Sequence, residues 1–471
     1  MTAPASTKPK TTGTPIEAGP VSTFTGGFRI RLRTPSRMRN VELVLLLIAC
    51  GLNGSAILLV QLGALGAVDW SLATLGIGLS ILVFAMHFAL RIVATEADPF
   101  ILPIATLLNG LGIAMIYRLD LADGSVGWAM ASIRQIAWTA IALALAIAVI
   151  VLLKNHRVLF RFRLTFALVG IVLLVMPIFF RPVNGANIWV QLGPFSFQPG
   201  ELGKLALAIF FAGYLVTARD SLSMIGRRVL GLTFPRARDL GPILVVFAAS
   251  MAVLVFQKDL GTALLYFGLF LVMLYVATGR ASWVVLGLGL FLGGAFAASR
   301  VLSYVGGRIN SWLDAFSTSN YEADGGSYQL VQGIFGLANG GLIGQGLGQG
   351  RPYVTPLAES DYIFASLGEE LGLVGVFAIL ALYLLFVSRG FRIGFAGQDD
   401  FGRLLAVGLA FVVGLQVFIV IGGVTRVIPL TGLTTPFLAA GGSSLVANWI
   451  IVALLLRLSD TVRSQPRTVI E

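Results

Sequence analysis

The chain is poor in the residues that enzymes use most often to bind transition metals or to activate a nucleophile. It has one cysteine, Cys50, and two histidines, His87 and His156, in 471 residues. A single cysteine excludes an intrachain disulfide and a thiolate metal cluster. His87 lies in an apolar segment and His156 lies among basic residues, which argues against a histidine-based zinc site or catalytic triad.

Charged residues are also scarce, at 12% of the chain, whereas 57% of the residues are hydrophobic and the mean hydropathy is +0.89. No single water-soluble core hides so much apolar surface, so the sequence predicts an all-α integral membrane protein, a polytopic helix bundle. About twelve segments look long enough to cross a bilayer. These segments are 41–65, 70–92, 99–118, 132–153, 164–180, 201–217, 239–257, 260–278, 282–300, 361–387, 404–424 and 436–457.

The distribution of positive charge indicates how these segments are oriented. Most of the 33 Lys and Arg residues fall on the cytoplasmic side if the N-terminus is cytoplasmic, and cytoplasmic loops keep positive charge. We therefore expect a multi-pass protein with both termini cytoplasmic: a disordered basic tail at 1–40 and a second tail at 461–471. The net charge of +11 is scattered over short loops, which indicates contacts with membrane lipids and argues against nucleic acid.

A polar, glycine-rich segment at 301–361 separates two of the predicted spans and is expected to face outward. It concentrates charge in Arg308, Asp314, Glu322, Asp324, Arg351, Glu359 and Asp361. Its glycines between Gly340 and Gly350 fit neither G-x-G-x-x-G nor a lysine-bearing phosphate loop, so nucleotide binding is not expected. A tightly folded, re-entrant backbone is the role that we predict for this glycine run.

Two further polar clusters interrupt apolar segments, where a charge is costly unless it is paired or faces water. In the first, Gln198 precedes a predicted helix start, and Glu201 and Lys204 can pair across one helical turn. In the second, Asp259 stands where a helix can begin and can cap it. A functional site and a purely structural role remain alternatives for both clusters. Residues 432–444, rich in small residues, suit close helix packing.

Taken in order, these elements resemble the SEDS family (shape, elongation, division and sporulation), the RodA/FtsW type of peptidoglycan polymerase. The matching elements are G-A-N-I-W-V-Q-L-G with F-Q-P-G-E-L-G-K-L at 185–205, K-D-L-G-T at 258–262, Y-Q-L-V-Q at 328–332, G-G-L-I-G-Q-G-L-G at 340–348, S-D-Y-I-F-A-S-L-G-E-E-L-G at 360–372 and T-T-P-F-L-A-A-G-G-S-S at 434–444. The chain departs from the family pattern at Lys258, where Pro is usual, at Gly200, where Ser is usual, and at 438–440.

The resemblance implies a core of ten transmembrane helices over 99–460, with an extracytoplasmic loop at 301–360, in a bacterial cytoplasmic membrane. Two additional N-terminal helices would then occupy 41–98. The overall pattern favours the RodA type, while a role in elongation or in division stays open.

The resemblance also implies a reaction. A hydroxyl of one lipid-linked disaccharide (lipid II) attacks the anomeric carbon of a growing glycan and expels undecaprenyl pyrophosphate. In the family, an aspartate in the large outer loop before the Y-Q element is the essential carboxylate. Asp324 is favoured for this role as general base, and Asp314 and Glu322 are the alternatives, because extra residues alter the spacing here.

Other residues follow from the same resemblance. Candidates for binding substrate or pyrophosphate are Arg308, Arg351, Lys204, Gln198 and Glu201, and structural or metal-binding candidates are Asp259, Glu359, Asp361 and Glu369. A divalent cation, Mg²⁺ or Mn²⁺, is compatible with the reaction. The implied protein partner is a class B penicillin-binding protein, a transpeptidase. A flippase that moves the same lipid-linked precursor is the alternative function, since many spans and broken helices suit a transporter too.

Overall fold

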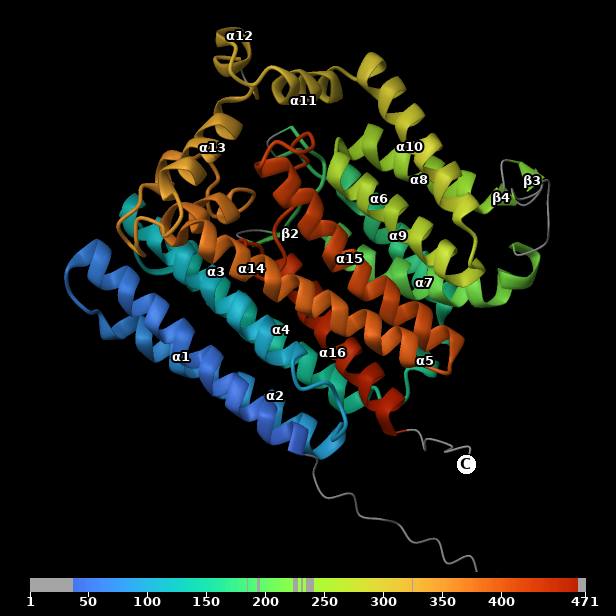
Figure 1. The fold of residues 1–471 in the computed structure, drawn as a ribbon, viewed down its shortest axis with the longest axis horizontal. Helices are drawn as coiled ribbons and strands as arrows, with labels where there is room; N and C mark the ends of the chain where they lie inside the picture. Colours follow the sequence, from blue (N-terminus) through green and yellow to red (C-terminus); the bar gives the residue numbers. More distant parts are fainter. Residues whose placement is uncertain are drawn as a thin grey trace, which may run out of the picture. The chain divides into compact units, whose positions relative to one another are not determined.

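The computed structural model describes residues 37–183, 185–192, 195–222, 228–229, 232–233, 241–323 and 325–464. These residues form a helical bundle with two short hairpins, as Figure 1 shows. The α-helices are α1 (Arg37–Leu65), α2 (Trp70–Val93), α3 (Ile101–Asp123), α4 (Ala131–Leu152), α5 (Arg157–Arg161), α6 (Arg163–Val175), α7 (Pro199–Leu222), α8 (Gly241–Gln257), α9 (Leu260–Thr278), α10 (Ala281–Val301), α11 (Ser303–Leu313), α12 (Thr318–Tyr321), α13 (Tyr328–Gly340), α14 (Ile363–Ala396), α15 (Asp400–Val424) and α16 (Gly442–Ser464).

Short elements complete the fold. The 3-10 helices are η1 (Gly127–Ala129), η2 (Met176–Phe179) and η4 (Pro352–Val354). The strands β1 (Val190–Leu192) and β2 (Phe195–Phe197) pair antiparallel, and so do β3 (Arg228–Val229) and β4 (Leu232–Thr233). The predicted tails, 1–40 and 461–471, fall largely outside the described residues.

Ten of the described helices are long and apolar enough to cross a membrane: α1, α2, α3, α4, α7, α9, α10, α14, α15 and α16. The predicted segments 164–180 and 239–257 coincide with shorter apolar helices, Arg163–Phe179 and Leu244–Gln257. Seventeen residues of α-helix span only about 26 Å, less than the hydrocarbon core of about 30 Å. The all-α multi-pass fold is confirmed, and twelve complete spans remain a prediction.

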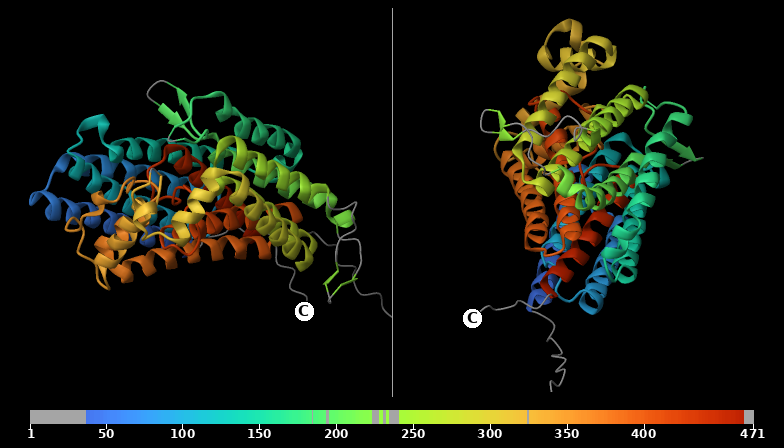
Figure 2. Two further views of the ribbon diagram at one scale, coloured as in Figure 1. Left: turned by 90° about the horizontal axis from the view of Figure 1, so that it is seen from above. Right: turned by 90° about the vertical axis from the view of Figure 1, so that its right-hand side faces the viewer.

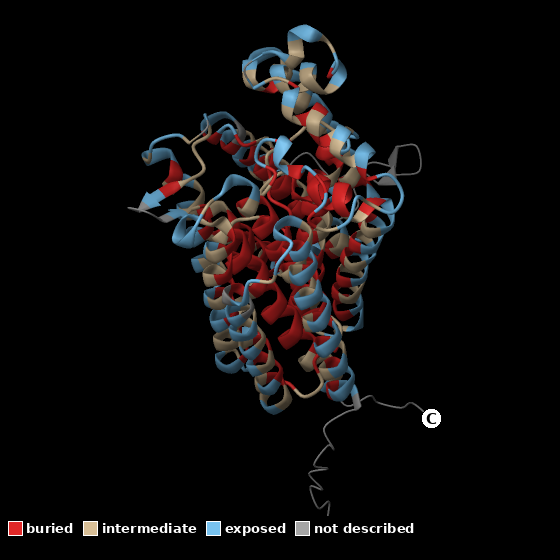
Figure 3. Cartoon of the chain, turned by 90° about the vertical axis from the view of Figure 1, so that its left-hand side faces the viewer, coloured by how far each residue is buried: buried red, intermediate tan, exposed pale blue. Residues whose placement is uncertain are grey.

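Burial separates the helices that form the core from those that face lipid. Most of α3, α15 and α16 is buried, whereas only 22% of the apolar stretch of each of α1, α2 and α10 is buried. Figure 3 shows the buried residues gathered in the centre of the bundle and the exposed ones on the outer helix surfaces. Because the exposed positions are mainly Leu, Val, Ile and Phe, they suit contact with lipid chains rather than water.

The segment 301–361 is not a loop throughout, since α11, α12, α13 and η4 lie within it. In Figure 2 these elements lie at one end of the membrane-spanning helices. We call that end of the bundle the loop side, and the opposite end, where α1 begins and α16 ends, the terminal side.

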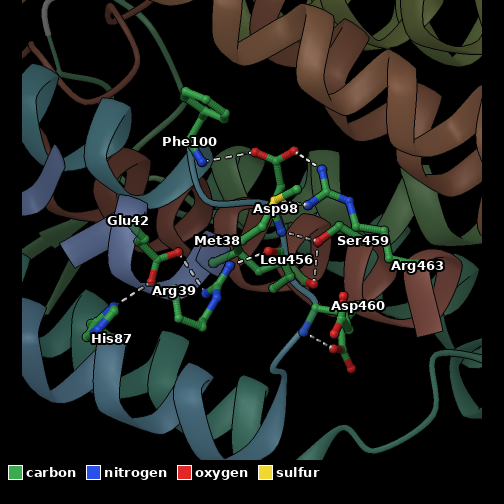
Figure 4. A network of polar contacts seen from close by, with 12 residues as sticks. Met38, Arg39, Glu42, His87, Asp98, Phe100, Leu456, Ser459, Asp460 and Arg463 are labelled. Carbon is green, nitrogen blue, oxygen red and sulfur yellow. Dashed lines mark hydrogen bonds and ion pairs between the residues drawn. The ribbon is translucent and has the colours of Figure 1, made fainter. Parts of the chain in front are cut away.

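The two N-terminal helices pack on the core, α1 against α3 and α2 against α4 (Figure 1). A buried polar network joins them to the core on the terminal side, as Figure 4 shows. Arg39 Nη1 donates to Glu42 Oε2 at 2.7 Å, and His87 Nδ1 lies 2.7 Å from Glu42 Oε1. The side chain of Asp98, which precedes α3, accepts from Arg463 at the end of α16. Charges of opposite sign thus compensate one another where the chain leaves the apolar region.

The last membrane helix begins at Gly442, although the sequence analysis placed its start at 436. The preceding residues form irregular, largely buried backbone in which Gly432 has φ 81° and Phe437 has φ 65°. Left-handed residues and Pro436 interrupt a helix, because they cannot continue its dihedral angles or its hydrogen bonds. This irregular segment carries several groups of the candidate site.

Candidate functional site

The predicted pair between Glu201 and Lys204 is present in the first turns of α7. Lys204 Nζ lies 2.6 Å from Glu201 Oε2, and both side chains are buried. The ammonium also donates to Gln416 Oε1 of α15 at 2.8 Å and to Asn448 Oδ1 of α16 at 3.2 Å. Three helices therefore meet at one cation, which forms an ion pair with Glu201 and donates hydrogen bonds to Gln416 and Asn448.

Gln198 lies beside this pair, at the start of α7. Its backbone N donates to Ser443 Oγ at 3.0 Å, which ties the start of α7 to the start of α16. Thr434 Oγ1 donates to Ser444 Oγ at 3.1 Å, and Gln416 Nε2 donates to the carbonyl of Thr434 at 2.9 Å. The small polar residues of 434–444 thus bind the helices around Lys204 to one another, in agreement with their predicted role in close packing.

Asp259 caps α9, as the sequence predicted. Its Oδ1 accepts from the backbone N of Thr262 at 2.9 Å, and the Thr262 hydroxyl donates to Oδ2. Burial raises the pKa of Asp259, and the nearby carboxylate of Glu201 acts in the same direction. The hydrogen bonds from Thr262 and the charge of Arg308 oppose this rise. Asp259 is therefore more than a cap, since it shares an electrostatic environment with Glu201 and Arg308.

Arg308 comes from α11 and reaches the irregular segment before α16. Its Nη1 donates to the carbonyl of Leu430 at 3.0 Å. A Cβ added to Gly432 would lie 3.7 Å from Arg308 Nη2 and 3.9 Å from Asp361 Oδ2, so both side chains flank this glycine. Burial raises the pKa of Asp361 to about 6, while the charge of Arg308 acts to lower it. We call Asp259, Arg308 and Asp361 the acid–arginine cluster.

Strained backbone surrounds this cluster. Four described non-glycine residues have positive φ: Lys258 (57°), Leu357 (53°), Arg426 (60°) and Phe437 (65°). Lys258 directly precedes Asp259, Leu357 lies just before Asp361, and the other two lie in the segment between α15 and α16. Such residues cost about 1–3 kcal/mol each and gather where the surrounding structure must place a functional group.

The predicted tight folding of the glycine run is present, and it completes a break in α14. Gly372 has φ 67° and ψ −174°, so the helix is interrupted there. The backbone N of Leu373 and of Val374 then donates to the carbonyls of Gly341 and Leu342. In return, the carbonyls of Glu369 and Glu370 accept from the backbone N of Gln345 and Gly346. The glycine run thus satisfies four backbone groups that an unbroken helix would satisfy by itself.

Two buried carboxylates lie at this break. Glu370 Oε1 accepts from Arg118 Nε at 3.2 Å, and its Oε2 accepts from the backbone N of Gly348 at 2.9 Å. Glu369 Oε1 accepts from Asn339 Nδ2 at 2.9 Å and from the backbone N of Arg351 at 3.0 Å. These carboxylates fix the glycine run, and their partners leave Glu369 with a structural role here.

Two of the three candidate bases, Asp314 and Glu322, lie near the far end of α11. Asp314 ends α11 and is exposed, and Glu322 is also exposed just after α12. Asp324 lies outside the described residues. Trp312 Nε1 donates to the carbonyl of Arg426 at 3.1 Å, and Arg426 Nε donates to the carbonyl of Trp312 at 2.7 Å. The end of α11 is therefore fixed against the same irregular segment that Arg308 binds.

The four candidate metal-binding carboxylates do not all meet at one point, although Asp259 and Asp361 share the acid–arginine cluster. Asp361 belongs to the acid–arginine cluster and Glu369 to the break in α14, while Glu359 is only partly buried. Within the described part of the chain, no three Asp, Glu, His or Cys side chains are grouped so that they could hold a metal ion. These residues therefore do not fit a metal site built from three carboxylates.

The sequence analysis did not assign a role to Arg118, Gln416 or Asn448. Arg118 lies near the loop-side end of α3 and is bound to Glu370 and to the carbonyl of Gly350. Gln416 and Asn448 are fully buried in membrane-spanning helices. A polar residue within an apolar span is itself a signal of a site or a partner, and that signal would have found all three.

Comparisons with known proteins agree with this arrangement. A family model described as "Cell cycle protein" and named for FtsW, RodA and SpoVE matches residues 99–464. The chain belongs to the FtsW/RodA/SpoVE family. The peptidoglycan glycosyltransferase RodA of Mycobacterium tuberculosis is 45% identical over 440 residues, which cover 92% of this chain and 93% of that protein.

Solved structures of two other proteins have a fold similar to that of this chain. The crystal structure of the rod shape determining protein RodA of Thermus thermophilus has a TM-score of 0.51 at 26% identity and covers 85% of this chain and 99% of its own. A chain from a peptidoglycan synthase complex that coordinates polymerisation and crosslinking has a TM-score of 0.53 at 25% identity, with the same coverage. The match to the family model begins two residues before α3, so α1 and α2 precede the region that the model describes.

Proposed function

We propose that this chain is a peptidoglycan glycosyltransferase of the RodA type that polymerises lipid II at the surface of a bacterial cytoplasmic membrane. The observation that carries the proposal is the acid–arginine cluster, which lies on the loop side of a bundle of membrane helices. A lipid-linked sugar needs an enzyme of this kind, because its tail stays in hydrocarbon while its sugar reacts at the surface. The names of the relatives support the same activity.

The reaction needs a base, because a sugar hydroxyl is a poor nucleophile near neutral pH. Asp324 is our first candidate, and the exposed carboxylates of Asp314 and Glu322 are the alternatives. The fixed end of α11 supports this region for the role, since Trp312 and Arg426 hold it at a defined place. A carboxylate there would take the proton of the acceptor hydroxyl as its oxygen bonds to the anomeric carbon.

The departing pyrophosphate gathers negative charge, which a fixed cation stabilises. Arg308 suits this role, because it lies on the loop side and one of its nitrogens is anchored by Leu430. The exposed side chain of Arg351 offers a second guanidinium. Lys204 is the weaker candidate, since Glu201, Gln416 and Asn448 already bind its ammonium. Gln198, Glu201 and Asp259 would then have a structural role and hold the starts of α7 and α9 in place around the site.

A divalent cation, Mg²⁺ or Mn²⁺, remains a prediction, with the substrate phosphates as its first ligands. The orientation is also proposed: positive charge favours cytoplasmic termini, which puts the loop side outside. We further propose a class B penicillin-binding protein as partner, because a glycan polymer becomes wall only when its peptides are cross-linked. The structural neighbour from a peptidoglycan synthase complex supports this pairing.

The test is polymerisation of labelled lipid II by the purified chain together with its transpeptidase partner. The variants Asp324→Asn, Asp314→Asn and Glu322→Gln separate the candidate bases. Asp123→Asn is the matched control, because Asp123 is an exposed acid at the loop-side end of α3. It belongs neither to the acid–arginine cluster nor to the group around Lys204. We expect wild type and the control to make polymer and one loop variant alone to make none.

The same preparation tests the alternative function. If wild-type protein makes no polymer but moves labelled lipid II between the leaflets of a vesicle, the chain is a flippase and the proposal is wrong. If all three loop variants remain active, the base lies elsewhere, and Asp361 is then the next carboxylate to replace.

A further inference from the structure

A cavity of about 290 Å³ lies between the two N-terminal helices and the core, bounded by α1, α2, α3, α4 and α16. None of its lining residues belongs to the acid–arginine cluster or to the group around Lys204. Two of the helices that bound it, α1 and α2, precede the region matched by the family model. Its surface is mainly apolar, and aliphatic side chains are the largest group in its lining. The uncharged polar side chains of Asn53, Gln61, Ser80, Thr106, Asn109 and Thr139 also line it, whereas no Lys, Arg, Asp or Glu among the described residues does.

Two glycines keep this cavity open. Gly54 of α1 and Gly76 of α2 both line it, and a Cβ added to either would meet no atom within 4 Å. Glycine weakens a helix, and in membrane helices it is usually found where two backbones approach closely. Gly110 of α3 makes a close contact of a related kind, since a Cβ there would lie 2.0 Å from the side chain of Asn53 of α1. Gly54 and Gly76 serve no such contact, so their effect is to leave space.

The cavity runs along the half of α1 nearest the loop side. Its lining extends from Cys50 to Gln61, and the eleven steps between these residues rise about 16 Å along a helix. Leu58 of α1 and Ile77 of α2 also line it and are exposed on the outer surface of the bundle. The cavity is therefore reached sideways, from the hydrocarbon of the membrane rather than from water.

We propose that this cavity binds one acyl chain of a membrane phospholipid, inserted from the leaflet on the loop side. An aliphatic lining of this kind attracts hydrocarbon through dispersion contacts that an empty space would forfeit. A polyprenyl pyrophosphate fits less well, because the lining lacks a cation to bind its phosphates. Trp70, which lies at the loop-side start of α2 and is exposed, suits the level of the lipid headgroup.

The bound chain would also support the glycine run. Val60, Leu72, Ile113, Tyr117 and Ile136 form a small buried cluster that shares residues with the cavity wall. Leu347 of the glycine run packs against this cluster. A chain in the cavity would therefore contact Leu72, Ile113 and Ile136, which belong to the cluster against which Leu347 packs. This inference does not depend on the proposed catalytic function.

The test is photolabelling in phospholipid nanodiscs, with a phospholipid that carries a diazirine on its acyl chain. Peptide mass spectrometry then locates the label. The variant Gly54→Leu with Gly76→Leu fills the cavity with side chains. The matched control is Gly51→Leu with Gly78→Leu, because these glycines lie on the same helices, also face open space, and do not line the cavity.

We expect the label in wild type and in the control to concentrate on residues 50–61 and 70–83, and the cavity-filled variant to lose most of it. Uniform labelling of all lipid-facing helices in wild type would overturn the proposal even if the variant fails to fold. Equal labelling of the two double variants would overturn it as well. If a modest excess of polyprenyl phosphate, but not of unlabelled phospholipid, removes the label, the occupant is the carrier chain and the phospholipid assignment is wrong.

Discussion

Arg118 of α3 and Glu370 of α14 form a buried ion pair, with 3.2 Å between Nε and Oε1. Each member also binds the glycine run. Arg118 Nη2 donates to the carbonyl of Gly350, and Glu370 Oε2 accepts from the backbone N of Gly348, both at 2.9 Å. One pair of side chains thus joins two membrane helices and the segment that packs between them.

Replacing Arg118 by Met should destabilise the protein, because Glu370 would keep a buried charge without its partner. We expect a loss of about 3–5 kcal/mol in the free energy of unfolding. The double variant Arg118→Met with Glu370→Met should recover a large part of it, since no lone charge remains. Thermal unfolding in detergent measures both. A double variant as unstable as the single one would contradict this account.

Asp361 should make the stability of the protein fall as pH rises. Its pKa is raised from 3.8 to about 6 by burial, against the charge of Arg308. The folded state therefore binds the proton more tightly than the unfolded state, so stability falls as pH rises from about 4 to about 6. Asp361→Asn removes this effect and should raise the free energy of unfolding at pH 7.5 by about 1–3 kcal/mol.

The measurement is the unfolding of wild type and Asp361→Asn at pH 4.5 and 7.5, together with lipid II polymerisation. We expect the variant to lose activity while it gains stability at the higher pH. Identical stability of the two proteins at pH 7.5 would show that the carboxylate is better solvated than its burial indicates.

Gly63 should tolerate no side chain, because α1 meets the glycine run there. A Cβ on Gly63 would lie 2.5 Å from the carbonyl oxygen of Leu347 and 3.0 Å from the Cα of Gly348. Gly63→Ala should cost about 1–3 kcal/mol and lower polymerisation by displacing the glycine run. The control Gly51→Ala has nothing within 4 Å and should be neutral or stabilising by up to about 1 kcal/mol. Equal effects of the two changes would refute a close contact at Gly63.

Asp399 should contribute to stability on the terminal side. Its Oδ2 accepts from the backbone N of Gly402 at 2.9 Å and lies 3.0 Å from His156 Nε2. Burial alone would raise the pKa of Asp399, but these hydrogen bonds and the charges of His156 and Arg157 outweigh burial and lower it. Asp399→Ala should therefore cost about 1–2 kcal/mol at pH 7.

The sign of the Asp399 effect can be checked with pH. Because its folded pKa is lowered, the stabilisation is present above the ordinary pKa of about 3.9 and is lost as pH falls below it. The difference between wild type and Asp399→Ala should therefore narrow toward pH 3. Asp400→Ala is the control, since Asp400 forms an exposed ion pair with Arg219 that is worth about 0–1 kcal/mol.

Local spacing predicted some of the site correctly. Glu201 and Lys204 pair as three-residue spacing on a helix allows, and Asp259 caps α9 as its position before Leu260 indicates. Both features depend on neighbours along the chain, which a sequence displays directly. The membrane fold could also be predicted, because apolar segments long enough to cross the hydrocarbon core can be recognised without knowledge of contacts.

Contacts between residues that lie far apart along the chain could not be predicted from the sequence. Arg118 and Glu370 are 252 residues apart, and no pattern in one sequence indicates that they meet. Asp361 and Glu369 lie in the same short stretch of chain, yet the start of α14 sends them to different clusters. The sequence left a structural and a metal-binding role open for both residues, and it did not indicate that they would lie apart. The choice between Asp324, Asp314 and Glu322 stays a prediction.

The break at Gly372 has a consequence for how the chain assembles in the membrane. The carbonyls of Gly341 and Leu342 emerge from the ribosome before their donors, Leu373 and Val374, and cannot be satisfied until α14 has been made. Until then, these four backbone groups lack the hydrogen bonds that they have in the folded protein. This corner must therefore fold after insertion, with α1 and α3 already in place. A molecule stopped before that step would have α1 and α3 in place while the contact between the glycine run and α14 is still missing.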